Sequence, residues 1–593
     1  MRELEYPFDA TEILSKKKSL RRQLLERNIN YVEKRIAILG GSTTSDIKLI
    51  LELFLLNYGI KPIFFESEYN KYWEDAMFED SELQDFNPEI VYICTSYRNI
   101  INPPDLSDTN VQISYKLDSE YSRFEQMWQK IFERFHCLII QNNFDFPITR
   151  LLGNKDATDV HGMVNFLTKL NIKFAEYAEQ HENFFVLDLN YLSALHGLDA
   201  WSDQFAFYMY KYAVAINLIP YLSFEIAKII KAILGKNKKG FVLDLDNTLW
   251  GGIVGDDGVE NLEIGQETAI GQSYYDFQKY LHELTKLGII LNVNSKNERE
   301  NAIAGLNHSE GLLKPDDFII IKANWNPKSQ NFSQIANELN LGADSLVFVD
   351  DNPAERAIIN HDLPDVATPE MTESYNYIQI IDHSGFFETT NISRDDLKKT
   401  EMYKENAKRN ELQASFTNYD DFLKSLEMSA KIEPFVPIYM SRIAQLTNKS
   451  NQFNLTTKRY TQAEIESVSN DPLYVTLYGK LEDKFGDNGV VSVVIGRQEK
   501  EKIHIDLWIM SCRVLKRNME HAMMDKLVEY CQKLGIEEIY GYYYPTPKNT
   551  MVKDFYGTIK FEKVSEDDAG NSVWRYNVPE NYQPQNKFIN VKE

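Results

Sequence analysis

FVLDLDNTLW, residues 241–250, is the stretch that decides the fold. Its apolar start is typical of a buried strand, and Asp244 and Asp246 follow directly, with Thr248 two residues further on. In open α/β sheets ligands bind at the carboxyl ends of the strands, and two carboxylates buried side by side are unfavourable unless a cation neutralises them. Magnesium takes oxygen ligands from a few carboxylates and leaves room for phosphate oxygens. The stretch therefore predicts a magnesium site at the edge of a parallel sheet.

Two further strands carry polar residues at their carboxyl ends. IILNVNS ends at Ser295, and SLVFVDDN delivers Asp350 and Asp351. Between them PKSQNF contributes Lys328, whose ammonium would neutralise charge on a transferring phosphoryl group. These strands alternate with helical stretches, which predicts a Rossmann-like, doubly wound parallel sheet over residues 236–376. Three strand ends then converge on one site.

This ordered set of motifs, DxDxT, then Ser, then Lys, then DD, resembles the haloacid dehalogenase (HAD) superfamily of aspartate-nucleophile phosphotransferases. The resemblance implies that Asp244 attacks phosphorus to give an aspartyl-phosphate, which splits a difficult displacement into two easier steps. It also implies that Asp246 protonates the leaving oxygen and later activates water. Only residues 249–294 separate the first two motifs, so we expect a minimal cap, with another domain or a partner protein as the lid.

The same resemblance assigns the other residues of the site. Ser295 and Lys328 would hold the phosphoryl oxygens, and Lys328 is preferred to Lys322 because it opens a helix before the final acid strand. Thr248 and Asn297 are expected to contact the substrate. The expected magnesium ligands are Asp244, the backbone carbonyl of Asp246, and Asp350. Asp351 is either a further ligand or a hydrogen-bonded acid behind the ligands.

The residues around these motifs indicate one family within this superfamily. DLDNTLWGGIVGDDG, NVNSKNE, NWNPKSQNF, VFVDDNPAER and LTNKSNQFNLTTKRY resemble the FkbH-like proteins, HAD subfamily IIIC, over essentially the whole chain. Members of the better-understood branch of this family take 1,3-bisphosphoglycerate, remove phosphate, and pass the glyceryl group as a thioester to an acyl carrier protein. The resemblance therefore implies a phosphorylated three-carbon substrate and an acyl carrier protein as partner. The residues themselves support only the phosphoryl chemistry.

After the HAD-like domain the chain becomes charged and helical over residues 377–428, which predicts connecting helices rather than a flexible linker. Residues 429–593 then alternate strands such as GVVSVVIG and IHIDLWIM with the helix MEHAMMDKLVEYCQKLG. This pattern predicts an α+β domain with a central antiparallel sheet. The domain resembles the GNAT-like acyltransferases.

The basic loop in SCRVLKRNME is the candidate binding site of this last domain. Arg513, Lys516 and Arg517 precede a helix that opens near Met519, and cations at a helix N-terminus suit the pyrophosphate of coenzyme A or the phosphate of a phosphopantetheine arm. Lys516 and Asn518 stand where close backbone approach favours glycine, which argues against tight binding of coenzyme A.

Two more features of this domain stay open. Cys512, beside Arg513, is either a thiolate that carries an acyl group or an inert cysteine of a buried strand. NKSNQFNLTTKRY is dense in amide and hydroxyl side chains, which either bind a polar substrate or satisfy a buried turn. Its members are Asn448, Asn451, Gln452, Asn454, Thr456 and Thr457.

The first domain, residues 1–235, alternates short apolar runs with amphipathic stretches, which predicts an α/β domain of the flavodoxin-like type. GGSTTS after the strand RIAIL resembles the nucleophile block of SGNH-type esterases, with Ser42 as the nucleophile. DAWS has Ser202 where the family has its histidine, and His161 and His196 are the substitutes. We therefore expect a non-catalytic scaffold or docking domain.

The amino-acid composition limits which binding partners and which cellular compartment are expected. The 593 residues include 88 acidic and 64 basic side chains, a net charge of −24, which argues against nucleic acid and anionic membranes. An acidic carrier protein would need a basic landing site, and the candidates are the runs at residues 16–22 and 236–239. We expect no membrane span and a cytoplasmic location, because no signal peptide is evident and the cysteines lack paired spacing. These are Cys94, Cys137, Cys512 and Cys531.

The sequence thus predicts a magnesium-dependent, HAD-type enzyme that dephosphorylates a three-carbon donor and transfers the acyl unit to a carrier protein. The alternatives are a phosphatase or acyltransferase acting on a sugar or nucleotide-sugar in surface polysaccharide biosynthesis, and a non-catalytic scaffold. The scaffold is disfavoured because every acid that the chemistry requires is present.

Overall fold

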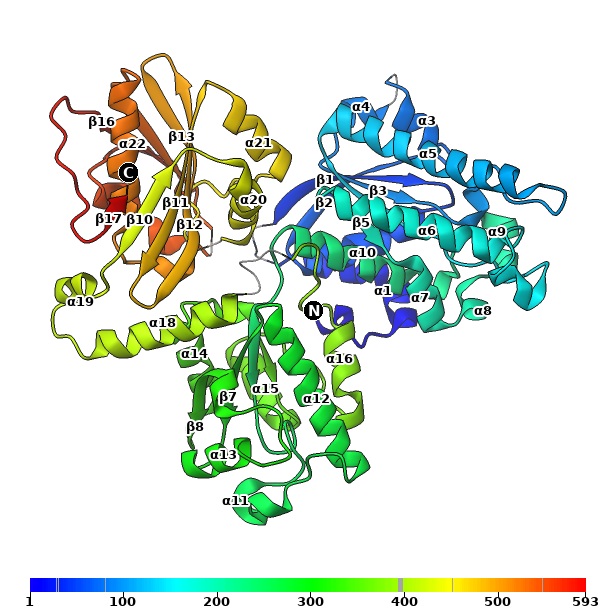
Figure 1. Cartoon of the computed structure of the whole chain (residues 1–593), viewed down its shortest axis with the longest axis horizontal. Helices are drawn as coiled ribbons and strands as arrows, with labels where there is room; N and C mark the ends of the chain where they lie inside the picture. The colour runs from blue at the N-terminus through cyan, green and yellow to red at the C-terminus, as the bar shows by residue number, and fades with distance from the viewer. Residues whose placement is uncertain are drawn as a thin grey trace. The chain divides into compact units, whose positions relative to one another are not determined.

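The structure is a computed structural model that describes residues 1–27, 29, 31–79, 82–392, 398–450, 452–546 and 548–592, with all of their side chains except those of Ala414, Lys449 and Cys512. The chain divides into two compact units, Met1–Ile233 and Leu234–Glu593 (Figure 1). Within the described residues, none of the helices has the length and apolar character needed to cross a bilayer.

The first unit is a five-stranded parallel sheet in the order β2-β1-β3-β4-β5. Its strands are β1 (Val32–Gly40), β2 (Ile60–Glu66), β3 (Ile90–Cys94), β4 (Leu138–Asn142) and β5 (Phe184–Leu187). Its helices are α1 (Ala10–Leu25), α2 (Ser45–Asn57), α3 (Tyr72–Met77), α4 (Glu82–Phe86), α5 (Asn110–Phe135), α6 (Met163–Gln180), α7 (Leu189–His196), α8 (Leu198–Trp201), α9 (Gln204–Tyr210) and α10 (Ile219–Ile233).

Alternating residues of β1 explain how both faces of this sheet are buried. Ala37 and Leu39 pack with the buried aromatic residues of α5 and α6, including Trp128 and Phe174. Ile36 is also fully buried, and because side chains alternate along a strand it points to the opposite face. The predicted α/β fold of this unit is confirmed.

The second unit begins with a four-stranded parallel sheet in the order β8-β7-β6-β9. Its strands are β6 (Gly240–Leu243), β7 (Ile290–Ser295), β8 (Phe318–Ala323) and β9 (Leu346–Val349). Its helices are α11 (Val254–Asp257), α12 (Ala269–Lys286), α13 (Arg299–Leu306), α14 (Lys328–Glu338), α15 (Pro353–Asp362) and α16 (Tyr377–His383).

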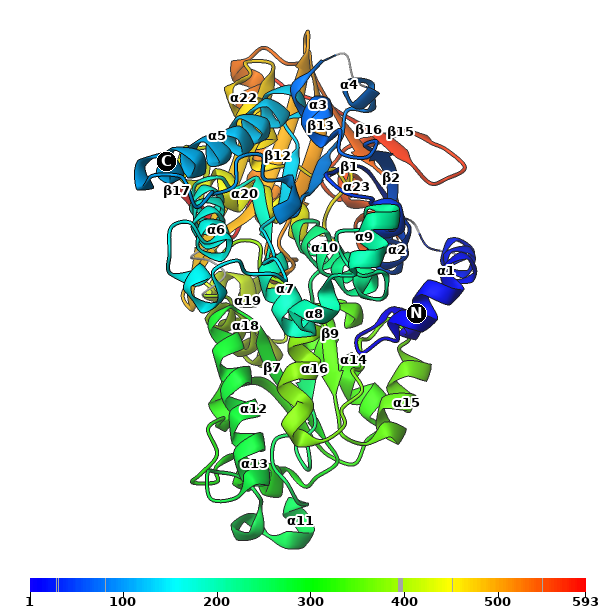
Figure 2. The same ribbon diagram turned by 90° about the vertical axis from the view of Figure 1, so that its right-hand side faces the viewer.

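Helices cover both faces of this sheet, which makes it doubly wound as predicted. Phe241 and Leu243 pack toward α12 and α16, which lie side by side in Figures 1 and 2. Val242 points the other way, into a core with Phe332 and Ile335 of α14. Alternate residues of β6 therefore pack into two separate cores. Asp244 follows directly at the carboxyl end of this strand.

The chain continues through α18 (Lys399–Ala414) and α19 (Tyr419–Ser425) into an eight-stranded sheet in the order β15-β16-β14-β13-β12-β11-β10-β17. Its strands are β10 (Ser429–Glu433), β11 (Tyr474–Asp483), β12 (Gly486–Glu499), β13 (Lys502–Met510), β14 (Glu538–Tyr543), β15 (Glu562–Glu566), β16 (Ser572–Asn577) and β17 (Asn590–Lys592). Its helices are α20 (Met440–Lys449), α21 (Gln462–Asn470), α22 (Met519–Lys533) and α23 (Phe555–Thr558).

This sheet is mixed, whereas the sequence predicted an antiparallel one. β13 and β14 are parallel because α22 carries the chain back across the sheet between them, and β17 adds to β10 in parallel. The other pairs are antiparallel. The predicted α+β class holds.

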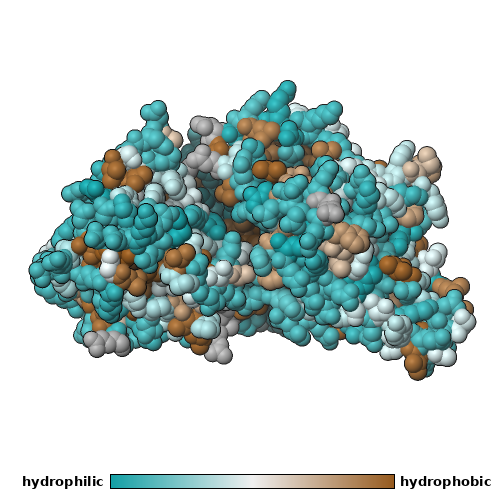
Figure 3. Space-filling view, turned by 90° about the horizontal axis from the view of Figure 1, so that it is seen from above, coloured by the Kyte–Doolittle hydropathy of each residue, from teal (hydrophilic) through white to brown (hydrophobic). Residues whose placement is uncertain are grey.

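The face seen in Figure 3 is mostly hydrophilic, and its hydrophobic residues gather in small patches. Patches of this kind are ordinary for a globular surface, because polar side chains are too few to cover it completely.

Asp145, which follows β4, is a buried acid that yields a testable prediction. Its side chain is 2% exposed, and burial raises its pKa to about 7. The folded chain therefore keeps a proton that the unfolded chain has lost, so the free energy of unfolding should fall as the pH rises from about 4 to about 7, by an amount on the order of 4 kcal/mol. We expect Asp145→Asn to lose less thermal stability than wild type between pH 5 and pH 8, measured by calorimetry.

The exposed Asp199 supplies the control for this comparison. Asp199→Asn should keep the wild-type dependence on pH. An equal loss of thermal stability between pH 5 and pH 8 in wild type and Asp145→Asn would show that Asp145 does not hold the proton.

Candidate active site

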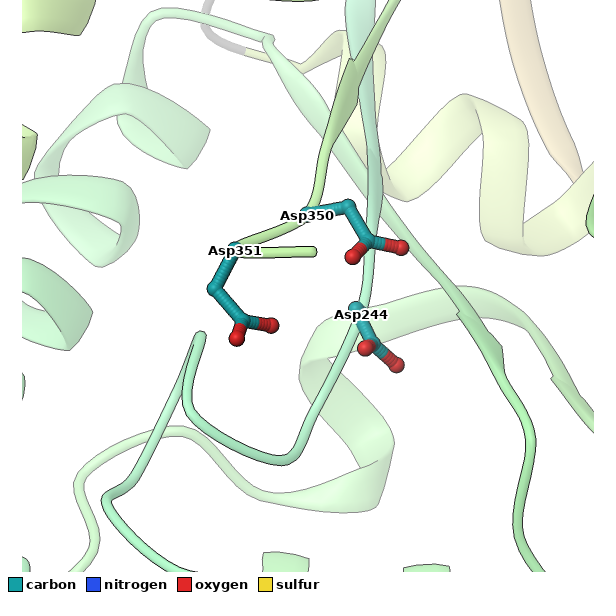
Figure 4. Close-up of side chains that lie close together, drawn as sticks. All are labelled: Asp244, Asp350 and Asp351. Atoms are coloured by element: carbon teal, nitrogen blue, oxygen red, sulfur yellow. The ribbon is translucent and has the colours of Figure 1, made fainter. Parts of the chain in front are cut away.

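Three carboxylates meet at the carboxyl edge of the four-stranded sheet. Asp244 follows β6, and Asp350 and Asp351 follow β9, its neighbour in the sheet. One oxygen from each carboxylate lies within 4.8 Å of the others. Figure 4 shows the three side chains gathered in one place, with Asp350 and Asp351 coming from the same loop. The sequence predicted this convergence.

Lys328, the first residue of α14, is bound between two of these acids. Its Nζ lies 2.8 Å from Asp244 Oδ2 and 2.6 Å from Asp350 Oδ2, and its side chain is only 3% exposed. Burial lowers the pKa of Lys328, but the two carboxylates outweigh burial and the net shift is upward. The lysine is therefore a fixed positive charge. Lys322, the alternative, instead pairs with Glu338, with Nζ 2.6 Å from Oε1.

The three acids carry more negative charge than Lys328 can neutralise. Burial, followed by the charge of Asp244, raises the pKa of Asp350 and that of Asp351. Asp244 Oδ1 is buried and has no hydrogen-bond partner in the described part of the chain. Three carboxylates and one ammonium leave an excess of negative charge. This donor set fits a hard divalent cation such as magnesium.

Asp246 is held by three donors. Its Oδ1 accepts hydrogen bonds from Trp250 Nε1 at 2.9 Å and from the backbone N–H of Val254 at 3.1 Å. Its Oδ2 accepts one from Asn297 Nδ2 at 2.8 Å. Burial raises the pKa of Asp246. A carboxyl group with a raised pKa and a fixed orientation is suited to deliver a proton.

Ser295, Thr248 and Asn297 lie in the same place and are buried. Asn297 Nδ2 also lies 3.2 Å from Ser295 Oγ, so this amide joins Ser295 to Asp246. Thr248 Oγ1 accepts a hydrogen bond of 3.3 Å from the backbone N–H of Asp351. The two residues expected to contact the substrate thus bind neighbouring site residues. Substrate contact by either one stays a prediction.

Sequence reasoning missed several residues that shape the site. Tyr274 and Tyr377 donate hydrogen bonds to the carbonyl of Asn247, at 3.3 and 3.0 Å, and so fix the turn after β6. Asn247 has a φ of 54°, a left-handed conformation that asparagine tolerates better than most residues. Arg356 donates to the carbonyls of Asp350 and Asp351, both at 2.7 Å. The motif VFVDDNPAER contains Arg356, but nothing in its spacing gives the arginine this role.

The candidate residues of the last domain lie in the loop between β13 and α22. Arg513 and Arg517 are buried, while Lys516 is exposed. Lys516 and Asn518 have φ angles of 66° and 65°, so non-glycine residues hold the left-handed conformation that glycine usually supplies. The backbone of Cys512 lies in a short helical turn with Arg513, and its side chain lies outside the described residues.

Ser42 of the first unit is 6% exposed and follows β1. His161 is not free to serve it as a base, because its Nδ1 lies 2.7 Å from Asp159 Oδ1 and its Nε2 lies 2.9 Å from the carbonyl of Asp108. His196 packs its ring against Tyr221 at a centroid distance of 4.3 Å. These contacts favour the scaffold interpretation of this unit.

Comparison with known proteins identifies the class. Residues 35–231 match the family described as FkbH, N-terminal domain, which confirms the predicted resemblance for this segment. A crystal structure of the N-terminal part of the protein BF1531 from Bacteroides fragilis, containing a phosphatase domain complexed with Mg, is similar to this chain. The sequence identity is 29%. The similarity covers 63% of this chain and 99% of that chain, with a TM-score of 0.59. The chain is a phosphatase-type enzyme.

Two further solved structures are also similar in part. Ard1 from Thermoplasma volcanium is 17% identical over 26% of this chain and 99% of that chain, with a TM-score of 0.21. The ribosomal-protein-S18-alanine N-acetyltransferase from Escherichia coli is 10% identical over the same shares, also with a TM-score of 0.21. None of the curated proteins matches the chain.

The amide of Asn297 is predicted to position the proton donor of this phosphatase-type site. Asn297→Ala removes one of the three bonds that orient Asp246. We expect kcat for p-nitrophenyl phosphate to fall about 10- to 100-fold with KM little changed, because the lost bond orients a group that acts in the transition state. Asn297→Asp, of the same shape, should cost more, since it places a like charge against Asp246.

Asn337, exposed on α14, supplies the control. Asn337→Ala should keep wild-type kinetics. A rise in KM with kcat unchanged in Asn297→Ala would instead assign Asn297 to substrate binding.

Proposed function

We propose that this protein is a magnesium-dependent phosphohydrolase with an aspartate nucleophile, acting on a phosphorylated three-carbon acyl donor and passing the acyl unit to an acyl carrier protein. The observation that carries the phosphoryl half is the buried group formed by Asp244, Lys328 and Asp350, with Asp246 two residues from the nucleophile. The carrier half is supported by the resemblance to FkbH-like proteins.

Asp244 would attack phosphorus. Its Oδ2 is bound to Lys328, whereas its Oδ1 has no hydrogen-bond partner among the described residues and keeps its lone pairs for the new bond. Formation of the bond between Asp244 and phosphorus breaks the bond between phosphorus and the leaving oxygen, which is the ester oxygen on the three-carbon unit. The acyl phosphate stays intact in this step, and its phosphate leaves when the carrier thiol attacks the acyl carbon. The ammonium of Lys328 lies beside the nucleophile and would stabilise the charge that gathers on the phosphoryl oxygens in this step.

Asp246 would give its proton to the leaving oxygen. It would then take a proton from the water that attacks phosphorus and breaks the aspartyl-phosphate, which restores both carboxyl groups. Trp250, Val254 and Asn297 hold the carboxyl in one orientation during both steps. Ser295, 3.2 Å from the Asn297 amide, would contribute its hydroxyl to a phosphoryl oxygen.

Magnesium fits the acids described above. Asp244, Asp350, Asp351 and the backbone carbonyl of Asp246 would hold it, and when bound it neutralises the excess charge of the acids and of the phosphoryl oxygens. The similar BF1531 structure contains Mg, which supports this assignment.

Asp244→Asn should reduce phosphate release by at least about 1000-fold, because the neutral amide is a much weaker nucleophile than the carboxylate and does not form the aspartyl-phosphate. The assay is phosphate release from p-nitrophenyl phosphate in the presence of magnesium, and removal of the metal with a chelator should abolish it reversibly. Asp256→Asn, at an exposed position on α11, is the matched control and should retain activity. Full activity of Asp244→Asn would rule out the aspartate nucleophile.

A second assay tests the donor and the acceptor. The protein is incubated with 1,3-bisphosphoglycerate, magnesium and a carrier protein that bears its phosphopantetheine arm, and the masses of both proteins are followed. We expect phosphate release that requires Asp244 and a glyceryl-sized mass gain on the carrier.

A transient gain on the enzyme that Cys512→Ala abolishes would place the intermediate thioester on Cys512. Phosphate release with no mass gain on either protein would contradict acyl transfer and leave a phosphatase. No release from this donor, together with release from a sugar phosphate, would favour the surface polysaccharide alternative.

A further inference from the structure

The parallel strands β13 and β14 separate soon after they pair. They are in register only from Lys502 to His504 against Glu538 to Tyr540, although β13 continues to Met510 and β14 to Tyr543. Strands that diverge leave backbone N–H and C=O groups on their facing edges, and those groups require partners when they are buried. An extended ligand whose amides can act as an added strand is one possible partner. Coenzyme A and phosphopantetheine both contain such an arm.

The chain fills this opening itself with residues 453–456, which we call the wedge segment. On the β13 side, Met510 N donates to the Phe453 carbonyl at 3.1 Å and Leu455 N donates to the Trp508 carbonyl at 3.3 Å. On the other side, Tyr544 N, directly after β14, donates to the Leu455 carbonyl at 2.9 Å. The wedge segment is therefore hydrogen-bonded to both edges of the opening.

Side chains fix the wedge segment in place. Phe453 and Leu455 belong to the main core of the domain, at 5% and 0% exposure. Thr456 Oγ1 donates to the carbonyl of Asp506 on β13 at 2.7 Å. Asn454 Oδ1 accepts from the N–H of Thr457 at 2.9 Å, and Asn549 Nδ2 donates to the Asn454 carbonyl at 2.9 Å. The described amide and hydroxyl groups named here satisfy a buried turn, one of the two alternatives that the sequence left open.

The arginines of the nearby loop are occupied as well. Arg517 is 8% exposed, and its guanidinium donates to Asp483 Oδ2 at 3.1 Å and to Asn406 Oδ1 of α18 at 2.6 Å. Arg513 is 7% exposed, and its Nε donates to Ser511 Oγ at 3.2 Å. Two of the three cations expected to pair with a pyrophosphate thus point into the protein. The predicted coenzyme A site does not fit the residues present.

We infer that the C-terminal domain does not take coenzyme A: the wedge segment occupies the opening that a pantetheine arm would need, and Arg513 and Arg517 anchor the loop and α18 instead of binding phosphate. The inference concerns a site separate from the aspartate site and does not rest on the proposed phosphatase function. Any carrier-bound thiol must then reach the acyl unit elsewhere on the protein.

Isothermal titration of the full chain with coenzyme A and with acetyl-coenzyme A tests the inference. We expect no saturable heat up to about 1 mM ligand, and saturable binding with a Kd below about 1 mM would overturn the inference. Phosphate release from p-nitrophenyl phosphate is measured on the same preparation. Because the two readouts are independent, loss of phosphatase activity would contradict the proposed function and leave the binding result unaffected.

Hydrogen exchange gives a second readout, which reports on whether the opening is closed and does not depend on how tightly the ligand binds. The amides of Leu455, Met510 and Tyr544, which make the bonds between the wedge segment and the two strands, should exchange slowly, and at a rate that coenzyme A does not change. Thr456→Val, which removes the hydroxyl bond to Asp506, should speed this exchange several-fold, whereas Thr558→Val at an exposed position on α23 should not. Fast exchange of these amides in wild type, or a change on adding coenzyme A, would show that the opening is available to the ligand.

Discussion

The ammonium of Lys328 between the carboxylates of Asp244 and Asp350 is the interaction on which the active site depends. Each of these three groups is almost fully buried, and an ionised group in such a place is very unfavourable without a partner. One lysine satisfies only part of the charge of Asp244, Asp350 and Asp351. The remaining excess of negative charge would favour a cation and, through the cation, a phosphoryl group. In the proposed function, binding and chemistry would both follow from one unbalanced set of buried charges.

The sheet makes this arrangement possible. Parallel strands all end at the same edge, so acids at the ends of β6 and β9 must be neighbours once the strands pair in register. For this reason the sequence predicted Asp244, Asp350 and Asp351 as one site. Lys328 could be predicted as well, because a helix that follows β8 begins at the same edge. The convergence of these residues followed from the order of strands and helices, which hydrophobic patterning gives, whereas their roles were implied by the resemblance to the HAD superfamily.

The residues that orient the chemistry could not be predicted in the same way. Asn297 binds Asp246 across 51 positions, and Tyr377 binds Asn247 across 130. Such contacts depend on side-chain directions after folding, and no local pattern in the sequence encodes them. The basic loop before α22 shows the converse error. Its charge suggested an anion site, but the partners of Arg517 are Asp483 and Asn406, which lie 34 and 111 positions away. The presence of a basic residue in a sequence does not show whether it will bind a ligand or another residue of the protein.

The same lesson applies to recognition of an acidic carrier. In the first basic run, Lys16 pairs with Glu12, Lys17 with Asp46 and Arg21 with Glu52. The pair of Lys16 and Glu12 is exposed, and exposed ion pairs contribute about 0–1 kcal/mol each, so a partner can replace this one at little cost. Paired charges, however, produce little field at a distance, and this run does not offset a net charge of −24. At this run, long-range attraction would therefore add little to carrier encounter, and affinity would have to come from contacts made after the two proteins meet.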